Sequence, residues 1–276
     1  MEENVITSVQ NARIKHVVAL QQKSSLRRQE GLFVVEGQRE IEHCIACGYE
    51  VTELFFCPSR SEIVGNLESL GIPSIIEVSP TVYEKMAYRG STEGLIAVAK
   101  VKDHSLHSLL LPSSSPLVVV LESVEKPGNL GAILRTAEAA GVDAVIVCDP
   151  LTDLYNPNLI RASIGGVFCV PTAVCTSQEC IAFLKEHGVR ILTAQLQDSY
   201  EYYDYDMRQA TAIVMGTEST GLTPQWREAA DAHIRIPMLG RLDSLNVSVS
   251  AAILMYEAVR QRKQQTATDK HGQTRT

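Results

Sequence analysis

Apolar and polar positions alternate along the first hundred residues in a way that predicts a small α/β arrangement. Short apolar runs predict strands at 32–36, 51–57, 74–78 and 95–101. Apolar residues at helical spacing predict helices over 9–22, 38–47, 62–70 and 81–86. Strands that alternate with helices in this manner are typical of an α/β domain.

The same alternation continues, with longer buried-type strands, from residue 117 onward. The expected strands are 117–121, 144–148, 168–170, 189–194, 213–215 and 233–236. The expected helices are 129–140, 159–163, 179–187, a short one from Pro224, and 247–259, with Asn129 capping the first. This order predicts a mostly parallel sheet covered by helices on both faces.

Polar segments mark the domain boundaries. Pro112, three consecutive serines and Pro116 make 102–116 a linker, and the polar residues 264–276 predict a disordered tail. The predicted organisation is therefore a domain over 1–101, the linker, a second domain over 117–263, and the tail. The acidic, tyrosine-rich segment 198–206 is either a surface loop or a mobile lid.

Polar side chains follow two strands of the second domain at the point where each strand ends. Glu218 comes after the strand at 213–215, and Ser244 and Asn246 come after the strand at 233–236. The carboxyl ends of parallel strands meet at one edge of a sheet, where ligands bind in open α/β folds. We therefore expect these three side chains near one another, although Ser244 and Asn246 could also cap the last helix.

Composition sets limits on the class of protein. The chain has 276 residues, 45% hydrophobic and 21% charged, and its apolar runs are too short to span a membrane. Its polar, acidic N-terminus does not resemble a signal peptide, so we expect a cytoplasmic protein. Among seven cysteines, Cys44 and Cys47 stand beside His43 without a second pair at zinc-site spacing. This pattern favours reduced, buried thiols and no metal.

The net charge of −7 argues against indiscriminate binding of nucleic acid, because phosphate affinity comes largely from Lys and Arg. One stretch, 13–28, nevertheless carries five basic residues and no acidic one. It is either a solvated helix face or a surface for nucleic acid. The chain also contains neither G-x-G-x-x-G nor a Walker loop, so the sequence does not support a dinucleotide-binding or P-loop protein.

Three motifs of the second domain resemble the SpoU–TrmH family of SPOUT-class RNA 2′-O-ribose methyltransferases. They are NLGAILRTA at 129–137, VMGTESTGL at 214–222, and IPM at 236–238 with SLNVS at 244–248. Two N-terminal stretches, 9–15 and 33–40, resemble the RNA substrate-binding domain of this family. Lys126 and Thr217 depart from the residues frequent at their positions.

The resemblance implies a fold, a cofactor and partners. It implies a SPOUT-type parallel sheet with a trefoil knot, preceded by a small ribosomal-protein-like α/β domain. It implies S-adenosylmethionine as cofactor, structured RNA (ribosomal RNA first) as substrate, and a homodimer with neither membrane nor metal. The open alternatives are a transfer RNA 2′-O-methyltransferase and a non-catalytic RNA-binding or ribosome-assembly protein. A small-molecule enzyme on the same kind of sheet is disfavoured by the missing glycine fingerprint.

The resemblance also assigns residues. It places Arg135 at the ribose and its phosphate, either as a base or as an electrostatic clamp, with Asn129 in support. Glu218, Ser244 and Asn246 would hold Arg135 and the RNA in register. The expected cofactor residues are Thr193, Ala194, Met215, Gly216, Ile236, Met238 and Leu245. The expected RNA-binding residues are Arg13, Lys15, Arg27, Arg28, Arg39 and Arg161.

Overall fold

The computed structural model describes residues 5–61, 67–88, 93–111 and 114–272, and the chain divides into two compact units. Unit 1 comprises Met1–Lys102 together with Asp153–Cys169, and unit 2 comprises Asp103–Thr152 and Val170–Thr276. The segment 153–169 was expected in the second domain, so the boundaries differ there from those predicted. Residues 62–66 of the predicted helix at 62–70 lie outside the described residues.

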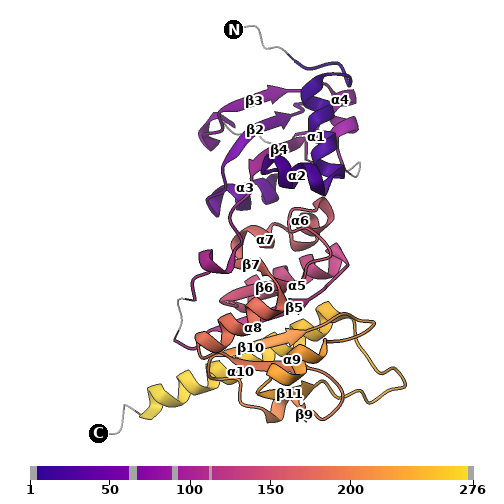
Figure 1. Cartoon of the computed structure of the whole chain (residues 1–276). Helices are drawn as coiled ribbons and strands as arrows, with labels where there is room; N and C mark the ends of the chain where they lie inside the picture. Colours follow the sequence, from indigo (N-terminus) through magenta and orange to yellow (C-terminus); the bar gives the residue numbers. More distant parts are fainter. Residues whose placement is uncertain (1–4, 62–66, 89–92, 112–113, 273–276) are drawn as a thin grey trace. The chain divides into compact units, whose positions relative to one another are not determined.

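Unit 1 is built on a four-stranded mixed sheet in the order β1-β4-β2-β3 (Figure 1). Strand β4 (Leu95–Lys100) pairs antiparallel with β1 (Leu32–Glu36) and β2 (Val51–Phe56), and β2 pairs parallel with β3 (Ser74–Glu77). Its helices are α1 (Ala12–Gln22), α2 (Ser24–Glu30), α3 (Gln38–Ala46), the 3₁₀ turn η1 (Leu67–Leu70) and α4 (Pro80–Met86). Apolar residues of α1 and α4, such as Ile14 and Met86, are buried against the sheet. The predicted α/β domain is confirmed.

The segment 153–169 belongs to unit 1 because its aromatic side chains complete that unit's core. It forms α6 (Pro157–Ser163) and α7 (Gly166–Cys169). The ring of Phe33 stacks on that of Tyr155 at 4.1 Å between centroids and lies 5.8 Å from that of Phe168. The Tyr155 hydroxyl also accepts a hydrogen bond from the backbone N–H of Lys102 at 3.1 Å.

The side chain of Arg27 is structural, which corrects its prediction as an RNA-binding residue. Only 4% of the side chain is exposed, and its guanidinium pairs with Asp153, itself 16% exposed. The same guanidinium donates to the backbone carbonyls of Leu20 and Gln21. Removing one partner of a buried, hydrogen-bonded ion pair destabilises a protein by about 3–5 kcal/mol. Helix α2 lies outside the predicted helices, and it depends on this tertiary pairing rather than on an apolar pattern.

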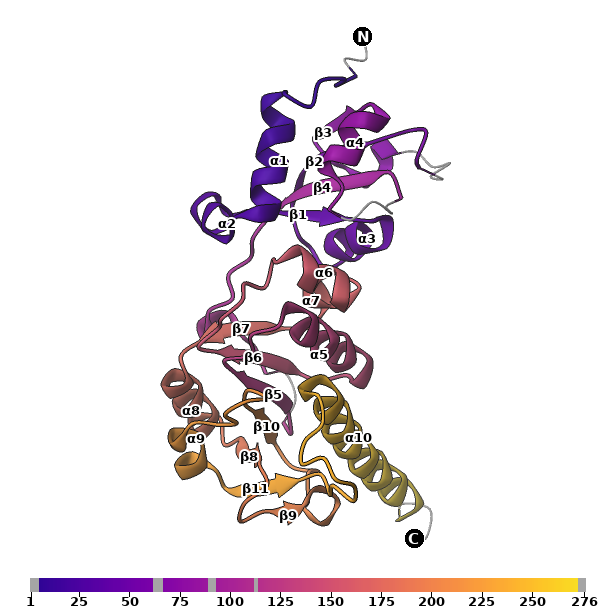
Figure 2. The ribbon, with the colours of Figure 1, turned by 90° about the vertical axis from the view of Figure 1, so that its right-hand side faces the viewer.

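Unit 2 contains a seven-stranded, wholly parallel sheet in the order β7-β6-β5-β10-β8-β11-β9 (Figure 2). The strands are β5 (Leu117–Glu122), β6 (Ala144–Cys148), β7 (Thr172–Cys175), β8 (Arg190–Ala194), β9 (Tyr200–Glu201), β10 (Thr211–Met215) and β11 (Ala232–Arg235). Short turns η2 (Leu106–Ser108) and η3 (Tyr202–Asp204) lie in the predicted linker and in the tyrosine-rich segment. The parallel α/β sheet is as predicted, and the knot stays an expectation of the resemblance.

Helices cover both faces of this sheet. On one face, Cys180 and Leu184 of α8 (Ser177–Glu186) and Trp226 of α9 (Pro224–Ala229) join the core formed by alternate strand residues. On the other face lie α5 (Pro127–Ala140) and α10 (Val247–Gly272), which pack against each other. Helix α5 ends where Gly141 adopts φ 65°, a left-handed conformation suited to glycine. Within the described residues, no helix is long and apolar enough to cross a membrane.

Three further elements differ from their predictions. The apolar run 168–170 lies at the end of α7 instead of forming a strand, because Pro171 follows and the strand begins only at Thr172. Helix α10 continues to Gly272, where a disordered tail was expected from residue 264. Helix α5 begins at Pro127, with Lys126 in the capping position, so Asn129 is free to bond elsewhere.

Candidate active site

The site lies where four loops leave the carboxyl ends of neighbouring strands in unit 2. Strand β5 has β6 on one side and β10 on the other, so the direction of strand succession reverses beside it. Such a reversal leaves a crevice at the carboxyl edge of a parallel sheet. The loops after β5, β8, β10 and β11 all reach this edge and carry the predicted residues.

The carboxylate of Glu218 joins three segments at this edge. Its Oε1 accepts hydrogen bonds from Asn246 Nδ2 at 2.7 Å, from Asn129 Nδ2 at 3.2 Å and from the backbone N–H of Val247 at 3.2 Å. Its Oε2 pairs with Lys126 Nζ at 2.9 Å. The Asn246 amide also donates to Asn129 Oδ1 at 3.1 Å. The loop after β10 is thereby tied to the first turns of α5 and α10.

The ionic form of Glu218 is favoured by these contacts. The hydrogen bond from Lys126, followed by that from the Val247 N–H, lowers the pKa of the Glu218 carboxyl. Lys126 was noted in the sequence only as a departure from the family pattern, and its role in this cluster was missed. Its place directly before Pro127, at the start of the first motif, was the available signal. Asn246 has two roles, since its Oδ1 also accepts from the N–H of Ser248 at 3.1 Å.

A cavity of about 370 Å³ opens beside this cluster, within the size range of small-molecule sites. The predicted cofactor residues that line it are Ala194, Met215, Gly216, Ile236, Met238 and Leu245. Thr193 does not line it: this residue is fully buried in β8, and its hydroxyl lies 2.6 Å from His233 Nδ1. A second, smaller cavity of about 110 Å³ lies on the Lys126 and Asn129 side, and Glu218 lines both.

Gln195 is a further lining residue that sequence reasoning missed. It follows directly after Ala194, where β8 ends at the cavity. Its Nε2 donates to the carbonyl of Gln197 at 2.9 Å, whereas its buried Oε1 has no hydrogen-bond partner among the described residues. A buried acceptor without a partner is costly, so a ligand that donates an N–H there would be favoured.

Two predicted catalytic residues stand outside the Glu218 cluster. Ser244 is exposed and lines the larger cavity, and its hydroxyl lies 3.5 Å from the carboxylate of its neighbour Asp243. Arg135 is exposed on α5, and its guanidinium makes no hydrogen bond or ion pair with another described residue. The structure thus brings together Glu218, Asn129 and Asn246, and the expected bonds from this group to Arg135 and Ser244 are absent.

Gly216 is the residue where the backbone of the β10 loop packs most closely. A Cβ atom there would lie 2.3 Å from the carbonyl oxygen of Gly221, a contact that only a backbone movement could relieve. The loop between them is closed by the Thr217 hydroxyl, which accepts a hydrogen bond from the N–H of Thr220 at 3.0 Å. Glycine is therefore required to bring this loop, and Glu218 within it, beside the cavity.

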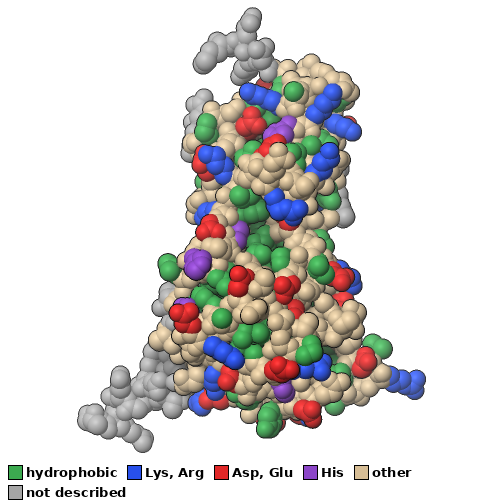
Figure 3. Space-filling model, viewed as in Figure 1, with side chains coloured by type: hydrophobic (Ala, Val, Ile, Leu, Met, Phe, Trp, Pro, Cys, Tyr) green, Lys and Arg blue, Asp and Glu red, His purple; other side chains and the backbone are tan. Residues whose placement is uncertain are grey.

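The residues expected to contact RNA, apart from Arg27, are exposed in unit 1. They are Arg13, Lys15, Arg28, Arg39 and Arg161. Arg39 and Arg161 line one cavity of about 160 Å³, together with Tyr88 and Glu36. Arg161 was expected in the second domain, and its place in unit 1 follows from the segment 153–169. Lys and Arg side chains are spread over the upper part of Figure 3, which is unit 1.

Comparison with known proteins identifies the class. The SpoU rRNA Methylase family model matches residues 116–256, and a model of the MRM3-like substrate binding domain matches residues 11–97. Since the first match covers more than half of the chain, the protein belongs to the SpoU rRNA methylase family.

Particular relatives cover nearly the whole chain. The 23S rRNA (guanosine(2553)-2′-O)-methyltransferase RlmP of Bacillus subtilis is 28% identical over 91% of this chain and 97% of its own. A crystal structure described as an RNA 2′-O ribose methyltransferase is 38% identical, with a TM-score of 0.81 over 93% of this chain and 98% of its own. An AdoMet-bound rRNA methyltransferase from Sinorhizobium meliloti is 28% identical, with a TM-score of 0.84 over 93% of this chain and 97% of its own.

We predict that Gly216→Ala lowers the affinity of the larger cavity for S-adenosylmethionine, whereas Gly240→Ala leaves this affinity unchanged. The added methyl meets backbone at position 216, and such overpacking costs about 1–3 kcal/mol, which corresponds to about fivefold to 150-fold in affinity if all of it falls on the bound state. At position 240 nothing lies within 4 Å of a new Cβ. Isothermal titration with S-adenosylmethionine as the probe measures both variants. Equal affinity in the two variants would show that the Gly216 loop does not shape this cavity.

Proposed function

We propose that the protein transfers a methyl group from S-adenosylmethionine to a ribose 2′-hydroxyl of ribosomal RNA. The observation that carries this proposal is the Glu218 cluster, which joins the first and second family motifs and the start of α10 beside a cavity lined by the third motif. Membership of the SpoU rRNA methylase family and the names of full-length relatives support it.

The residues of the larger cavity fit S-adenosylmethionine. Apolar side chains such as Met215, Ile236 and Leu254 line it beside polar groups, which suits a ligand with an aromatic base and a charged amino acid. The unpartnered Gln195 Oε1 would accept an N–H from that ligand. When bound, the cofactor supplies the activated methyl carbon, and the chain's task is to position the acceptor and manage its proton.

Arg135 takes the role of an electrostatic clamp in this proposal. A guanidinium keeps its proton in proteins, so it is poorly suited to act as a base. It is well suited to bind a phosphate and to stabilise the charge that develops on a 2′-oxygen. The side chain is exposed and free of protein partners within the described part of the chain, so its charge is available to RNA.

We predict that Arg135→Ala lowers methyl transfer at least about a hundredfold, the usual effect of losing one such contact. Because Arg135 holds no other side chain, S-adenosylmethionine affinity and melting temperature should be unchanged. The assay is transfer of labelled methyl to ribosomal RNA that lacks the modification, with ribose methylation mapped by sequencing. Glu138→Ala, another exposed α5 residue, is the control.

The outcomes of this assay separate the alternatives. Methylation of transfer RNA alone would assign the other substrate class. No transfer to any RNA despite tight S-adenosylmethionine binding would favour a non-catalytic RNA-binding protein. A variant that retains more than about a tenth of the activity would remove Arg135 from the centre of the mechanism.

RNA recognition is assigned to the exposed basic residues of unit 1. The chain is acidic overall, so attraction to phosphate has to come from a localised surface. Arg13, Lys15 and Arg28 lie on α1 and α2, within the region matched by the substrate-binding family model. Arg39 and Arg161 line a common cavity, whose other charged residues are Glu36, Glu40 and Glu93.

We predict that the double variant Lys15→Ala, Arg28→Ala weakens RNA binding. The slope of the logarithm of the affinity against the logarithm of the salt concentration should become shallower by about one to two, because binding with fewer phosphate contacts releases fewer counterions. The charge-matched control is Lys185→Ala with Lys263→Ala, two exposed lysines of unit 2. Filter binding at several salt concentrations measures both pairs. Arg27→Ala should instead lower the melting temperature of unit 1. An unchanged salt slope in the first pair would place the RNA surface elsewhere.

A homodimer is part of the same proposal. Val249 and Tyr256 are 47% and 49% exposed on one face of α10, with the partly buried Ile253 between them. Residues at i, i+4 and i+7 form a continuous helical stripe, and an exposed apolar stripe of this kind is typical of a protein interface. A second copy of the chain, related by a two-fold axis, would cover this stripe.

The proposal also includes a cytoplasmic location for the protein.

We predict that Tyr256→Glu dissociates this dimer, because the new charge would be buried without a partner. Light scattering at micromolar concentration should give twice the mass of one chain for the wild type and the mass of one chain for the variant. Leu110→Glu, at a residue 78% exposed outside α10, should stay dimeric. A wild-type protein with the mass of one chain would contradict the dimer.

A further inference from the structure

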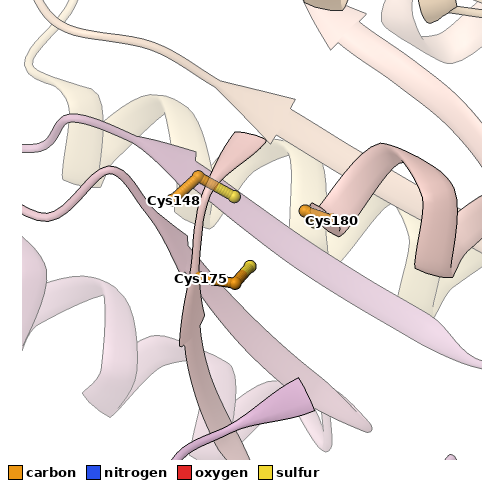
Figure 4. A group of neighbouring side chains, drawn as sticks. All are labelled: Cys148, Cys175 and Cys180. Carbon is orange, nitrogen blue, oxygen red and sulfur yellow. The ribbon is translucent and has the colours of Figure 1, made fainter. Parts of the chain in front are cut away.

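Three thiols converge on one point in unit 2. Cys148 is the last residue of β6, Cys175 the last residue of β7, and Cys180 lies in α8. Cys148 and Cys175 are direct partners in the parallel register, so their side chains leave the same face of the sheet toward α8. All three Sγ atoms lie within 4.8 Å of one another (Figure 4). All three cysteines are free thiols.

The surroundings of the thiols favour a cation. Cys148 and Cys180 are fully buried and Cys175 is half-buried, which leaves one side open to water. Glu122 is the register partner of Cys148 on β5, and its buried carboxylate accepts hydrogen bonds from Ser177 and Thr223. The carboxylate of Asp149, next in the chain, accepts from Ser177 Oγ at 2.6 Å. Two carboxylates beside the thiols oppose their ionisation, so all three can become thiolates only when a cation neutralises most of their charge.

The thiol arrangement matches the requirements of zinc. Zinc binds thiolates at about 2.3 Å, which places the sulfurs of a tetrahedral site about 3.8 Å apart. The three Sγ atoms need only small rotations to reach that spacing from within 4.8 Å.

We propose that Cys148, Cys175 and Cys180 bind one Zn²⁺ ion, with a water molecule as the fourth ligand on the Cys175 side. Three Zn–S bonds replace water ligands of the aqueous ion, which leave to solvent, and one water stays bound as the fourth ligand. Three S–H bonds break and three protons leave to solvent, without any oxidation. A divalent ion with three thiolates carries a net charge of −1. A monovalent copper ion would leave −2 beside Glu122 and Asp149, so the site favours zinc.

The ion would cross-link elements far apart in the sequence. It would tie the ends of β6 and β7 to α8, whose Ser177 bridges to Glu122 and, through it, to Thr223 at the start of α9. Leu222, the neighbour of Thr223, lines the larger cavity. The zinc site would therefore stabilise the sheet edge beside the active site without contacting it.

Metal analysis of the whole chain tests the proposal directly. Purified protein is reduced with a phosphine, incubated with zinc alone and desalted. The number of zinc ions per chain is then measured by elemental mass spectrometry. We expect one zinc ion per chain in the wild type and in Cys57→Ala, a buried thiol of unit 1 that serves as the control. Cys180→Ala and Cys148→Ala should lose at least about nine-tenths of the bound zinc, because each variant leaves only two protein ligands for the ion.

A second measurement needs no variant. Zinc should slow alkylation of Cys175 at least about tenfold, since a bound thiolate is not a free nucleophile, while Cys47, also half-buried, should be unaffected. Zinc should also raise the melting temperature, more so at higher pH, because binding releases protons. Wild-type protein that retains no zinc, or that binds cuprous ion and not zinc, would overturn the proposal. Equal zinc in wild type and Cys180→Ala would place the ion elsewhere.

Discussion

The arrangement of the active-site edge depends on one carboxylate. Glu218 accepts hydrogen bonds from Lys126, Asn129, Asn246 and the Val247 backbone, groups that belong to two other segments, the starts of α5 and α10. A carboxylate can satisfy this number of donors because it offers two oxygens and no competing donor of its own. With an amide or a hydroxyl at this position, at least one of the donors would lose its partner. The first turns of α5 and α10 are therefore held in register by the loop that follows β10.

This constraint explains why the cavity lies where it does. The loop can reach across only because Gly216 allows the backbone of Gly221 to approach it closely. The same loop then lines both cavities, so the group that fixes the helices also borders the space for ligands. Glu218 contributes by positioning the loops rather than by acid–base chemistry. Arg135 has no bond to this cluster, so its guanidinium is available to bound RNA. A rigid support together with an exposed guanidinium that is unpaired among the described residues suits a reaction that depends on placing two reactants together.

The sequence predicted the elements of the parallel sheet because their buried strands are continuous apolar runs with clear ends. It also placed Glu218 and Asn246 together, since strand ends and family motifs both point to one edge, whereas Asn129 was expected beside Arg135 and Ser244 within the group. It could not predict the role of Arg27, because an arginine in a polar stretch looks the same whether solvent or Asp153 surrounds it. The run at 168–170 was misread for a related reason, since short apolar runs fit strand and helix equally well. Gln195 carries no pattern of its own and is defined only by what folding places beside it, whereas Lys126 was missed although it stands at the start of the first motif.

The segment 153–169 has a consequence for how the chain is made. Domains generally fold as units during synthesis, with the N-terminal one first. Here the first unit lacks Asp153, the partner of Arg27, and the rings of Tyr155 and Phe168 until about fifty residues of the second unit have been translated. During synthesis, Phe33 and Tyr49 therefore lack the rings of Tyr155 and Phe168 that pack against them in the finished protein. The first unit can therefore be completed only after synthesis of the second unit has begun.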